Sequence, residues 1–334
     1  MKILIVRPFT RTAFELGEYC AKAFSQLGHE VRLFNFRYWH SSFLGKIGFF
    51  HTWHNLRKVI SKFKPGFVLV IKGDKIAPEI IFDTRKKFKT PMVNWWIDDP
   101  LWIRVSSRIS PLYDYFFTND PQCVEVHQRA GCPNAKFLTF GCDPDIHRIA
   151  RLNEDEKKKL GSEVCFTGTM VPQRERMLEV LADFDLKIWW PRMMQYTDED
   201  IKIKKKKIDS SSLLFSKFTG RDVWREEMVK VFNASKICLN IHSQGGWGTN
   251  MRTFEVTGCG SFLLCEFRET LSDLFKIGEE IVCFKDTVEL KELVKYYLSH
   301  SEERERIARK GQERTYKEHT YKHRMTEMFS SIHF

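Results

Sequence analysis

The sequence has no long apolar run. Its apolar stretches, such as "FVLVI" at 67–71, fall far short of the roughly 20 residues that a membrane-spanning helix needs. The apolar part of the N-terminal "MKILIVRPF" is too short for a secretory signal, and no small-residue cleavage site follows it. We therefore expect this segment to form a buried strand and the protein to be cytoplasmic, with at most a peripheral contact at the inner membrane face.

The nine cysteines include no Cys-x-x-Cys pair. Scattered cysteines in odd number, in a chain of this length, favour reduced and buried thiols over a disulfide framework or a zinc site. His319 and His323 lie one helical turn apart, as two metal ligands can, but no third ligand stands near them in the sequence. The sequence predicts no metal ion.

Acidic residues are the minority among the charged side chains. The 43 Asp and Glu residues are outnumbered by 54 Lys and Arg residues, which gives a formal net charge of +11. This balance favours anionic partners: a nucleotide, a nucleic acid, a phosphorylated polymer or a membrane surface. The most basic stretch is "IKIKKKKIDSSS" at 201–212. Such runs usually form solvated helix ends or loops, and the alternative is a contact with an anionic acceptor or a membrane.

The length and composition favour two globular lobes. A chain of 334 residues is long for one core, and 43% hydrophobic and 14% aromatic residues are ample for packed interiors. The charged stretch after "FGCDPDIH" carries few core residues and marks a boundary. We expect a first lobe at 1–145, a linker at 146–162, a second lobe at 163–318 and a final helix at 319–334.

Short apolar runs alternate with helical patterns in both lobes. The expected strands are "KILIV", "VRLFNF", "FVLVI", "MVNWWID" and "YDYFFTND" in the first lobe, and "EVCFTGT", "LKIWW", "KICLNIH", "GSFLLCE" and "IVCF" in the second. Helices are expected between them, for example at 53–63, after Pro78 and around 222–233. Repeated βαβ units predict an α/β protein with two Rossmann-like, doubly wound lobes, whose ligand sites lie at the carboxyl ends of the strands.

The second lobe carries residues that suit a nucleotide. Such a site needs amide donors for phosphate, a cation for the remaining charge and a carboxylate for the ribose hydroxyls. Gly168 and Thr169 lie where an expected strand gives way to a loop, so that backbone amides can approach an anion, and Arg174 follows near the start of the next helix. The alternative is an ordinary strand-to-helix turn.

The loop "GGWGTNMRTFEVTGCGSFLLCE" at 245–266 is the second candidate segment. Thr249 and Asn250 are possible helix caps, and Arg252 and Glu255, three residues apart, lie on one helical face. His242 ends the strand that leads into this loop; a histidine that packs in the core is the alternative to a role in binding. The candidate donor-binding residues of this region are His242, Gly246, Trp247, Gly248, Thr249, Asn250, Arg252 and Glu255.

Two adjacent acids, Asp98 and Asp99, end the apolar strand in "NWWIDDP". Side chains of neighbouring strand residues point to opposite sides, so at most one of the two faces a shared site. That carboxylate is a candidate general base or a ligand for a substrate hydroxyl. A cap before Pro100 is the alternative. No Gly-x-Gly-x-x-Gly follows the first strand, where "RPFTRTAF" stands instead, so a nicotinamide dehydrogenase is the least favoured enzyme class.

Three C-terminal stretches carry a resemblance to a known family. "SKICLNIH", "GWGTNMRTFEVTGCGSFLL" and the segment from "IGEEIVCF" to "YKHRM" resemble the CgeB-like glycosyltransferases, a family of spore maturation proteins in the GT-B superfamily. In the N-terminal half, the "DDP" after an apolar strand, "YDYFFTND" and "AKFLTFGCDPDIH" are similar too. The resemblance covers nearly the whole chain.

The resemblance implies a GT-B fold, with two lobes that face each other across a cleft and a final helix that crosses back to the first lobe. A nucleotide-sugar donor, linked to UDP, GDP or dTDP, would bind mainly to the second lobe. Glu255 matches the second glutamate of the Glu-x7-Glu motif, which holds the ribose hydroxyls in retaining members of the superfamily. Trp247 replaces the first glutamate. Retention therefore does not follow, and inversion with Asp98 or Asp99 as base is the alternative.

The resemblance also implies catalysis without a divalent ion or another cofactor, because side chains such as Arg174 and Arg252 would neutralise the leaving diphosphate. The acceptor is open: an anionic polymer, a glycan or a protein. The competing hypothesis is a non-catalytic protein that binds nucleic acid or another polyanion on a degenerate GT-B scaffold. It rests on the net charge and on Trp247, and it predicts binding that weakens steeply with salt.

Overall fold

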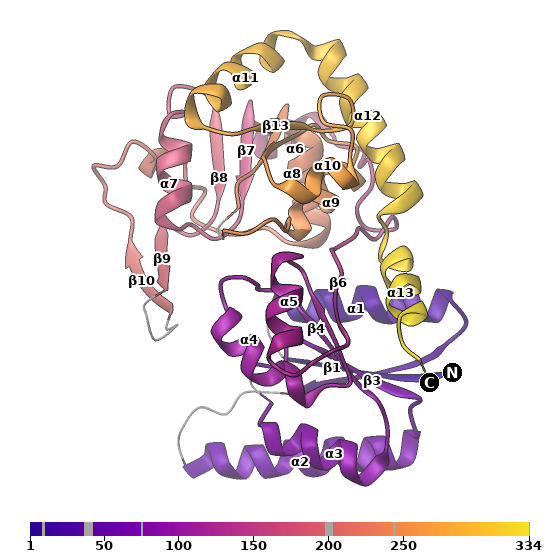
Figure 1. Cartoon of the computed structure of the whole chain (residues 1–334). Helices are drawn as coiled ribbons and strands as arrows, with labels where there is room; N and C mark the ends of the chain where they lie inside the picture. Colours follow the sequence, from indigo (N-terminus) through magenta and orange to yellow (C-terminus); the bar gives the residue numbers. More distant parts are fainter. Residues whose placement is uncertain (9–10, 37–42, 75, 198–202, 243–244, 334) are drawn as a thin grey trace. The chain divides into compact units, whose positions relative to one another are not determined.

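The computed structural model describes residues 1–8, 11–36, 43–74, 76–197, 203–242 and 245–333 (Figure 1). These residues divide into two compact units. Unit 1 consists of Met1–Thr139, Gly246–Gly248 and Tyr321–Phe334, and unit 2 consists of Phe140–Gly245 and Thr249–Thr320. The stretch 146–162, expected as a linker, groups with unit 2, and within it α6 (Glu154–Leu160) contacts α8 (Arg225–Ala234).

Unit 1 is built on a parallel sheet of six strands in the order β2-β1-β3-β4-β5-β6. Its strands are β1 (Lys2–Pro8), β2 (Glu30–Phe36), β3 (Phe67–Ile71), β4 (Met92–Trp96), β5 (Tyr115–Thr118) and β6 (Ala135–Phe137). Its helices are α1 (Arg11–Gln26), α2 (Phe43–Phe63), α3 (Pro78–Phe88), α4 (Ile103–Ile109), α5 (Gln122–Arg129) and α13 (Tyr321–Ser330). Strands β3, β4 and β5 are buried along their whole length, which explains why they are continuous apolar runs.

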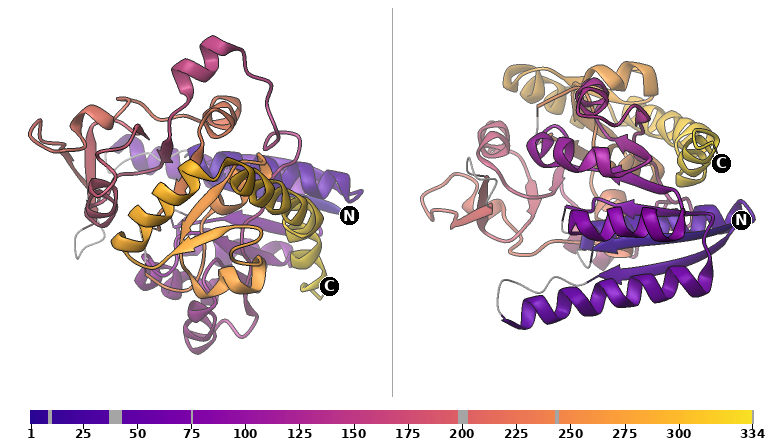
Figure 2. Two further views of the ribbon diagram at one scale, coloured as in Figure 1. Left: turned by 90° about the horizontal axis from the view of Figure 1, so that it is seen from above. Right: turned by 60° about the horizontal axis from the view of Figure 1, so that its bottom comes forward.

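Helices cover both faces of the unit 1 sheet (Figure 1, and right-hand view of Figure 2). On one face, side chains of α2 and α3 pack against alternate residues of the strands, as Ile60 does in the cluster that contains Leu4 and Val68. On the other face α1 packs beside α13, where the rings of Tyr19 and Tyr321 stack with 4.9 Å between their centroids. The C-terminal helix thus belongs to the core of unit 1.

Unit 2 is built on a second parallel sheet, with strands in the order β13-β12-β11-β7-β8. The strands are β7 (Val164–Thr167), β8 (Leu186–Trp189), β11 (Ile237–Asn240), β12 (Leu263–Glu266) and β13 (Val282–Phe284). The remaining helices are α7 (Pro172–Glu179), α9 (Met251–Gly258), α10 (Glu269–Leu274), α11 (Thr287–Ser299) and α12 (Ser301–Glu318). The order places β7 and β11 side by side, so the residues that follow them meet at one edge.

The basic stretch does not form the expected helix end. It contributes β10 (Ile203–Lys207), which pairs antiparallel with β9 (Met193–Thr197). Figure 1 and the left-hand view of Figure 2 show this ribbon projecting from unit 2. The four lysines of β10 are exposed; the first two residues of the stretch lie outside the described residues. Lysines on an exposed strand also prevent pairing with other strands.

Within the described residues, no helix is both long and apolar enough to cross a membrane.

Candidate functional site

The predicted donor residues of unit 2 lie at the carboxyl edge of its sheet. Thr169 follows β7 and His242 follows β11, while α9 begins directly after Asn250. The Asn250 side chain accepts a hydrogen bond from the backbone amide of Arg252 at 3.0 Å and so caps this helix, as expected for a capping residue. Hydrogen bonds connect several of these segments to one another.

Arg174 joins two of the loops at this edge. Its Nε donates to the carbonyl of Ile241 at 2.9 Å and its Nη1 donates to the carbonyl of Thr169 at 2.7 Å. The side chain is buried. Burial is the main cause that lowers its pKa to about 10, the charge of Arg252 adds to this effect, and Glu266 opposes it. Arg174 therefore fixes the loops after β7 and β11 relative to each other, in addition to any role toward an anion.

Gly168 lies beside this arginine with a φ of +155°, at the limit of the left-handed region that favours glycine. A Cβ at this position would lie 3.4 Å from Nη1 of Arg174 and 3.5 Å from the Phe166 ring. The loop after β7 is therefore closely packed against the guanidinium that holds it.

His242 is part of a buried polar network. Its Nδ1 lies 3.2 Å from Nδ2 of Asn250, which also donates to Oδ1 of Asn240. Because an amide nitrogen only donates, Nδ1 of the ring accepts and the proton of the neutral imidazole is on Nε2, toward Sγ of Cys265 at 3.6 Å. Burial first, and then the charges of Arg268 and Arg174, hold the pKa of His242 well below its ordinary value. The ring is neutral and serves to orient the loop before α9.

Arg252 and Glu255 form the ion pair that their spacing predicts, between Nη1 and Oε2. Glu255 is only 3% exposed. Its other oxygen, Oε1, lies 3.8 Å from Nε2 of His147. The carboxylate predicted to hold a ribose is thus a buried charge between a guanidinium and an imidazole.

Glu266 is a residue of this edge that the sequence analysis did not select. It ends β12, and its Oε2 accepts a hydrogen bond from the backbone amide of His242 at 2.8 Å. Arg268 lies 3.2 Å from Oε1. Burial raises the pKa of Glu266, while Arg268, the amide of His242 and Arg174 lower it, with a net rise. The rule that ligand sites lie at carboxyl ends of strands points to this position.

The part of the glycine loop that belongs to unit 1, Gly246–Gly248, is held by a carboxylate of the same unit. Oδ2 of Asp120, just after β5, accepts hydrogen bonds from the backbone amides of Trp247 and Gly248, both at 2.9 Å. A Cβ at Gly246, whose φ is +96°, would lie 2.2 Å from the same oxygen. A Cβ at Gly248 would lie 2.3 Å from the carbonyl oxygen of Asn119.

These contacts give a structural reason for Gly246 and Gly248. The amides of Trp247 and Gly248, two of the candidate donor-binding residues, bind a carboxylate of the protein itself. The Trp247 side chain is 49% exposed.

The two candidate bases differ in their surroundings. Asp99 is buried, and its carboxylate accepts hydrogen bonds from Ser106 Oγ and Thr118 Oγ1, both at 2.7 Å, and contacts Nε2 of His127 at 2.8 Å. This set of partners makes Asp99 a structural residue beneath the strand ends. A proton transfer by Asp99 would require these bonds to break.

Asp98 is partly exposed and pairs with Nζ of Lys72 at 2.5 Å. Burial on its own lowers the pKa of Lys72, but the carboxylates of Asp98 and Asp74 outweigh burial and raise it. The lysine therefore stays charged beside Asp98. Of the two acids, only Asp98 has an appreciably exposed side chain.

The described residues contain no cluster of three or more His, Cys, Asp or Glu side chains placed to hold a metal ion. His319, one of the two histidines with ligand spacing, is buried with Nε2 2.8 Å from the carbonyl of Leu274.

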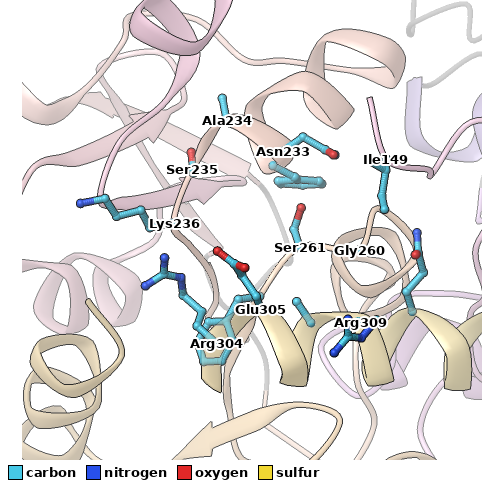
Figure 3. A pocket seen from close by; sticks show the side chains of 14 residues that line it. Ile149, Asn233, Ala234, Ser235, Lys236, Gly260, Ser261, Arg304, Glu305 and Arg309 are labelled. Carbon is cyan, nitrogen blue, oxygen red and sulfur yellow. The ribbon is translucent and has the colours of Figure 1, made fainter. Parts of the chain in front are cut away.

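A cavity of about 440 Å³ lies elsewhere in unit 2 (Figure 3). Lys236, Ser261 and the α12 residues Arg304 and Glu305 line it, together with Asn233 and Gln312. Lys236 directly precedes β11 and Ser261 lies two residues before β12, so the cavity is at the amino edge of the sheet, opposite the predicted donor residues. Asn233 and Gln312 already donate to backbone carbonyls. The cavity contains none of the predicted site residues.

Comparison with known proteins agrees with this fold. Residues 173–330 match the family described as glycosyl transferase-like, a segment that contains Arg174, His242, Arg252 and Glu255. The chain is 22% identical to the spore protein CgeB of Bacillus subtilis (strain 168), over 75% of this chain and 77% of that protein.

Solved structures give the same class. A structure of Anabaena Alr3699/HepE with UDP and glucose has a TM-score of 0.68 at 12% identity, covering 99% of this chain and 100% of that one. A glycosyltransferase from Rickettsia africae has a TM-score of 0.66 at 11% identity, covering 98% and 97%. The chain has the GT-B fold, and over three quarters of its length it is similar in sequence to CgeB, so the resemblance expected from the sequence is confirmed.

Proposed function

We propose that this protein is a glycosyltransferase that moves a sugar from a nucleotide-sugar donor, linked to UDP, GDP or dTDP, to an acceptor, without a divalent ion. The observation that carries the proposal is the buried Arg252–Glu255 pair on α9, directly after the glycine loop and within the segment that matches the glycosyl transferase-like family. Two of the solved structures with a similar fold are complexes of Anabaena Alr3699/HepE with UDP and with UDP-glucose, which supports a nucleotide-sugar donor.

In this proposal Glu255 accepts hydrogen bonds from the ribose hydroxyls, and Arg252 holds the carboxylate in place. The amino end of α9 and the positive charges of Arg252, Arg174 and Arg268 favour the diphosphate. These fixed charges would stabilise the leaving nucleoside diphosphate as its negative charge develops, which is the function that a divalent ion supplies in other enzymes.

We assign the role of base to Asp98. An acceptor hydroxyl attacks the anomeric carbon of the donor sugar, a new glycosidic bond forms, and the bond from that carbon to the diphosphate oxygen breaks. The hydroxyl proton moves to the Asp98 carboxylate, and the nucleoside diphosphate leaves with the electron pair. Trp247 in place of a glutamate supports this single displacement, with inversion, because an indole can neither accept the proton nor supply the negative charge.

An anionic acceptor or surface is supported by the net charge of +11 and by the exposed lysines of β10. Candidates are an anionic polymer or glycan, and a peripheral contact at the inner membrane face would use the same charges. The second candidate function, polyanion binding without catalysis, rests on the same lysines and on Trp247. It predicts steeply salt-dependent binding of a polyanion with no turnover of nucleotide sugars.

The test is nucleoside diphosphate release from UDP-, GDP- and dTDP-sugars by the purified protein, with EDTA present and with cell-derived polysaccharide or water as acceptor. The proposal expects release from one nucleotide class that persists in EDTA and is lost in Asp98→Asn. Release that requires added Mg²⁺ or Mn²⁺ contradicts metal independence. No release from any donor, together with polyanion binding, favours the second function.

A further inference from the structure

His147 is packed directly beneath α9. The side chain has no exposed surface, and the Tyr316 hydroxyl donates to its backbone carbonyl at 2.8 Å. A Cβ at Gly258, the last residue of α9, would lie 3.1 Å from Cβ of His147 and 3.0 Å from Cβ of Cys142. The glycine lets α9 approach this segment closely, which brings Glu255, one turn earlier, over the imidazole.

The tautomer of His147 follows from its local hydrogen bonds. The backbone amide of Asp143 donates to Nδ1 at 3.0 Å, so Nδ1 carries no proton and the neutral ring carries its proton on Nε2. The amide of His147 donates to the carbonyl of Asp143 at 2.7 Å, and the two bonds together fix the ring. Burial lowers the pKa of His147, although Glu255 and Asp143 act in the opposite direction, so the ring is neutral at physiological pH.

The fixed Nε2–H is therefore presented to Glu255, whose Oε1 lies 3.8 Å away. This separation is longer than a hydrogen bond but close enough for an N–H dipole to attract a buried carboxylate. Arg252 holds the other oxygen. We propose that His147 is a positioning residue, whose Nε2–H orients the Glu255 carboxylate for the ribose hydroxyls of the nucleotide.

The inference rests on the proposed function, because it assigns a role to His147 only through Glu255. A carboxylate held at one oxygen can rotate about its side-chain torsions, whereas one held at both oxygens presents a single geometry. A positioning role predicts a loss of nucleotide affinity, expressed in Kd and KM, with little change in kcat.

The test compares two amide substitutions of His147 that each keep one of its functions. In His147→Asn the amide oxygen can still accept from the Asp143 amide, but the group that faces Glu255 is lost. In His147→Gln the amide nitrogen reaches toward Glu255 and keeps a donor there. The probe is calorimetric titration with UDP, GDP and dTDP, with thermal unfolding of every variant as the control for folding.

We expect His147→Asn to raise the Kd of the bound nucleotide about tenfold, because the attraction between the Nε2–H dipole and the buried carboxylate is lost, and His147→Gln to stay within about threefold of the wild type. In a Glu255→Gln background, His147→Asn should have almost no further effect. The inference would be overturned if both His147 variants lost nucleotide affinity equally and in proportion to their loss of thermal stability. It would also be overturned if His147→Asn raised the Kd as much in the Glu255→Gln background as in the wild type. If Glu255→Gln itself binds nucleotide normally, the proposed donor site fails instead.

Discussion

Arg252 and Glu255 form an ion pair on one face of α9, and the carboxylate of this pair is buried. A pair of this kind cannot be broken cheaply, because the remaining charge would have no access to water. Arg252 and Glu255, which we propose to bind the donor, therefore also stabilise α9.

Replacing Arg252 by Gln should therefore destabilise the protein. We expect the free energy of unfolding to fall by about 3 kcal/mol, since Glu255 would keep a buried charge without its guanidinium. The measurement is urea unfolding at neutral pH. Arg221→Gln is the matched control, because Arg221 and Glu227 pair bidentately at 2.7 Å but are both exposed, and its cost should be below about 1 kcal/mol. Equal costs would contradict a buried Glu255.

Asp98→Asn and Asp99→Asn should separate catalysis from stability. Asp98→Asn should lower kcat by about 10²- to 10⁴-fold, because it removes the proposed base, and should cost less stability than Asp99→Asn, because the Asp98–Lys72 pair is partly exposed. Asp99→Asn should lower the free energy of unfolding by about 2–3 kcal/mol, because the carboxylate loses its charge toward His127 and the acceptor capacity used by Ser106 and Thr118. Turnover and thermal melts of both variants decide between them; a stable but inactive Asp99→Asn would transfer the role of base to Asp99.

Two glycines of the loop, Gly245 and Gly248, should differ in their tolerance of an added methyl group. Gly248→Ala should destabilise unit 1 by about 1–3 kcal/mol, because the new methyl group would meet the backbone carbonyl of Asn119. Gly245→Ala should be tolerated, since a Cβ there has no heavy atom within 4 Å. Thermal unfolding measures both. Comparable losses in the two variants would contradict the close packing of Gly248 against the Asn119 carbonyl.

Acid should destabilise the protein in part through His242. Its pKa is held well below the ordinary 6.5 in the folded chain, so below pH 6.5 only the unfolded chain takes up this proton. Stability should therefore fall as pH decreases, by up to about 1.4 kcal/mol per pH unit for this group. Glu266 acts with the opposite sign, because its raised pKa lets the folded chain take up a proton first.

The matching measurement is the free energy of unfolding in urea at several pH values between 5 and 7.5, for the wild type and His242→Asn. The asparagine oxygen can still accept a hydrogen bond from Asn250, so the variant should fold. Its free energy of unfolding should depend less steeply on pH, by the equivalent of about one proton taken up on unfolding. An unchanged slope would contradict a neutral, buried His242.

Much of the fold was predictable because buried parallel strands leave a local signal. Runs such as "ILIV" at 3–6 and "FVLVI" at 67–71 are apolar at every position, since helices cover both faces of the sheet. The Arg252–Glu255 pair and the cap by Asn250 were likewise predictable, because both depend on spacing within one helix. The basic strand β10 was not, since four consecutive lysines carry no period and the pairing with β9 is what makes it a strand.

The partners of the site residues could not be predicted from local patterns. Asp120 and Trp247 are 127 residues apart, and nothing near either residue indicates that the carboxylate binds the loop amides. His147 reaches Glu255 only because Gly258 permits a close approach. Asp98 and Asp99 have the same local sequence context, and only their surroundings show that one is enclosed by hydrogen bonds.

The most direct measurement is calorimetric titration of the wild type and Glu255→Gln with UDP-, GDP- and dTDP-sugars in the presence of EDTA. Glu255→Gln keeps the shape of the side chain and removes the charge, and the exposed Glu226→Gln is the control. We predict saturable binding of one nucleotide class by the wild type and the control, weakened at least about tenfold in Glu255→Gln. Equal affinity of the wild type and Glu255→Gln, or no binding of any nucleotide sugar by the wild type, would contradict a donor site on α9.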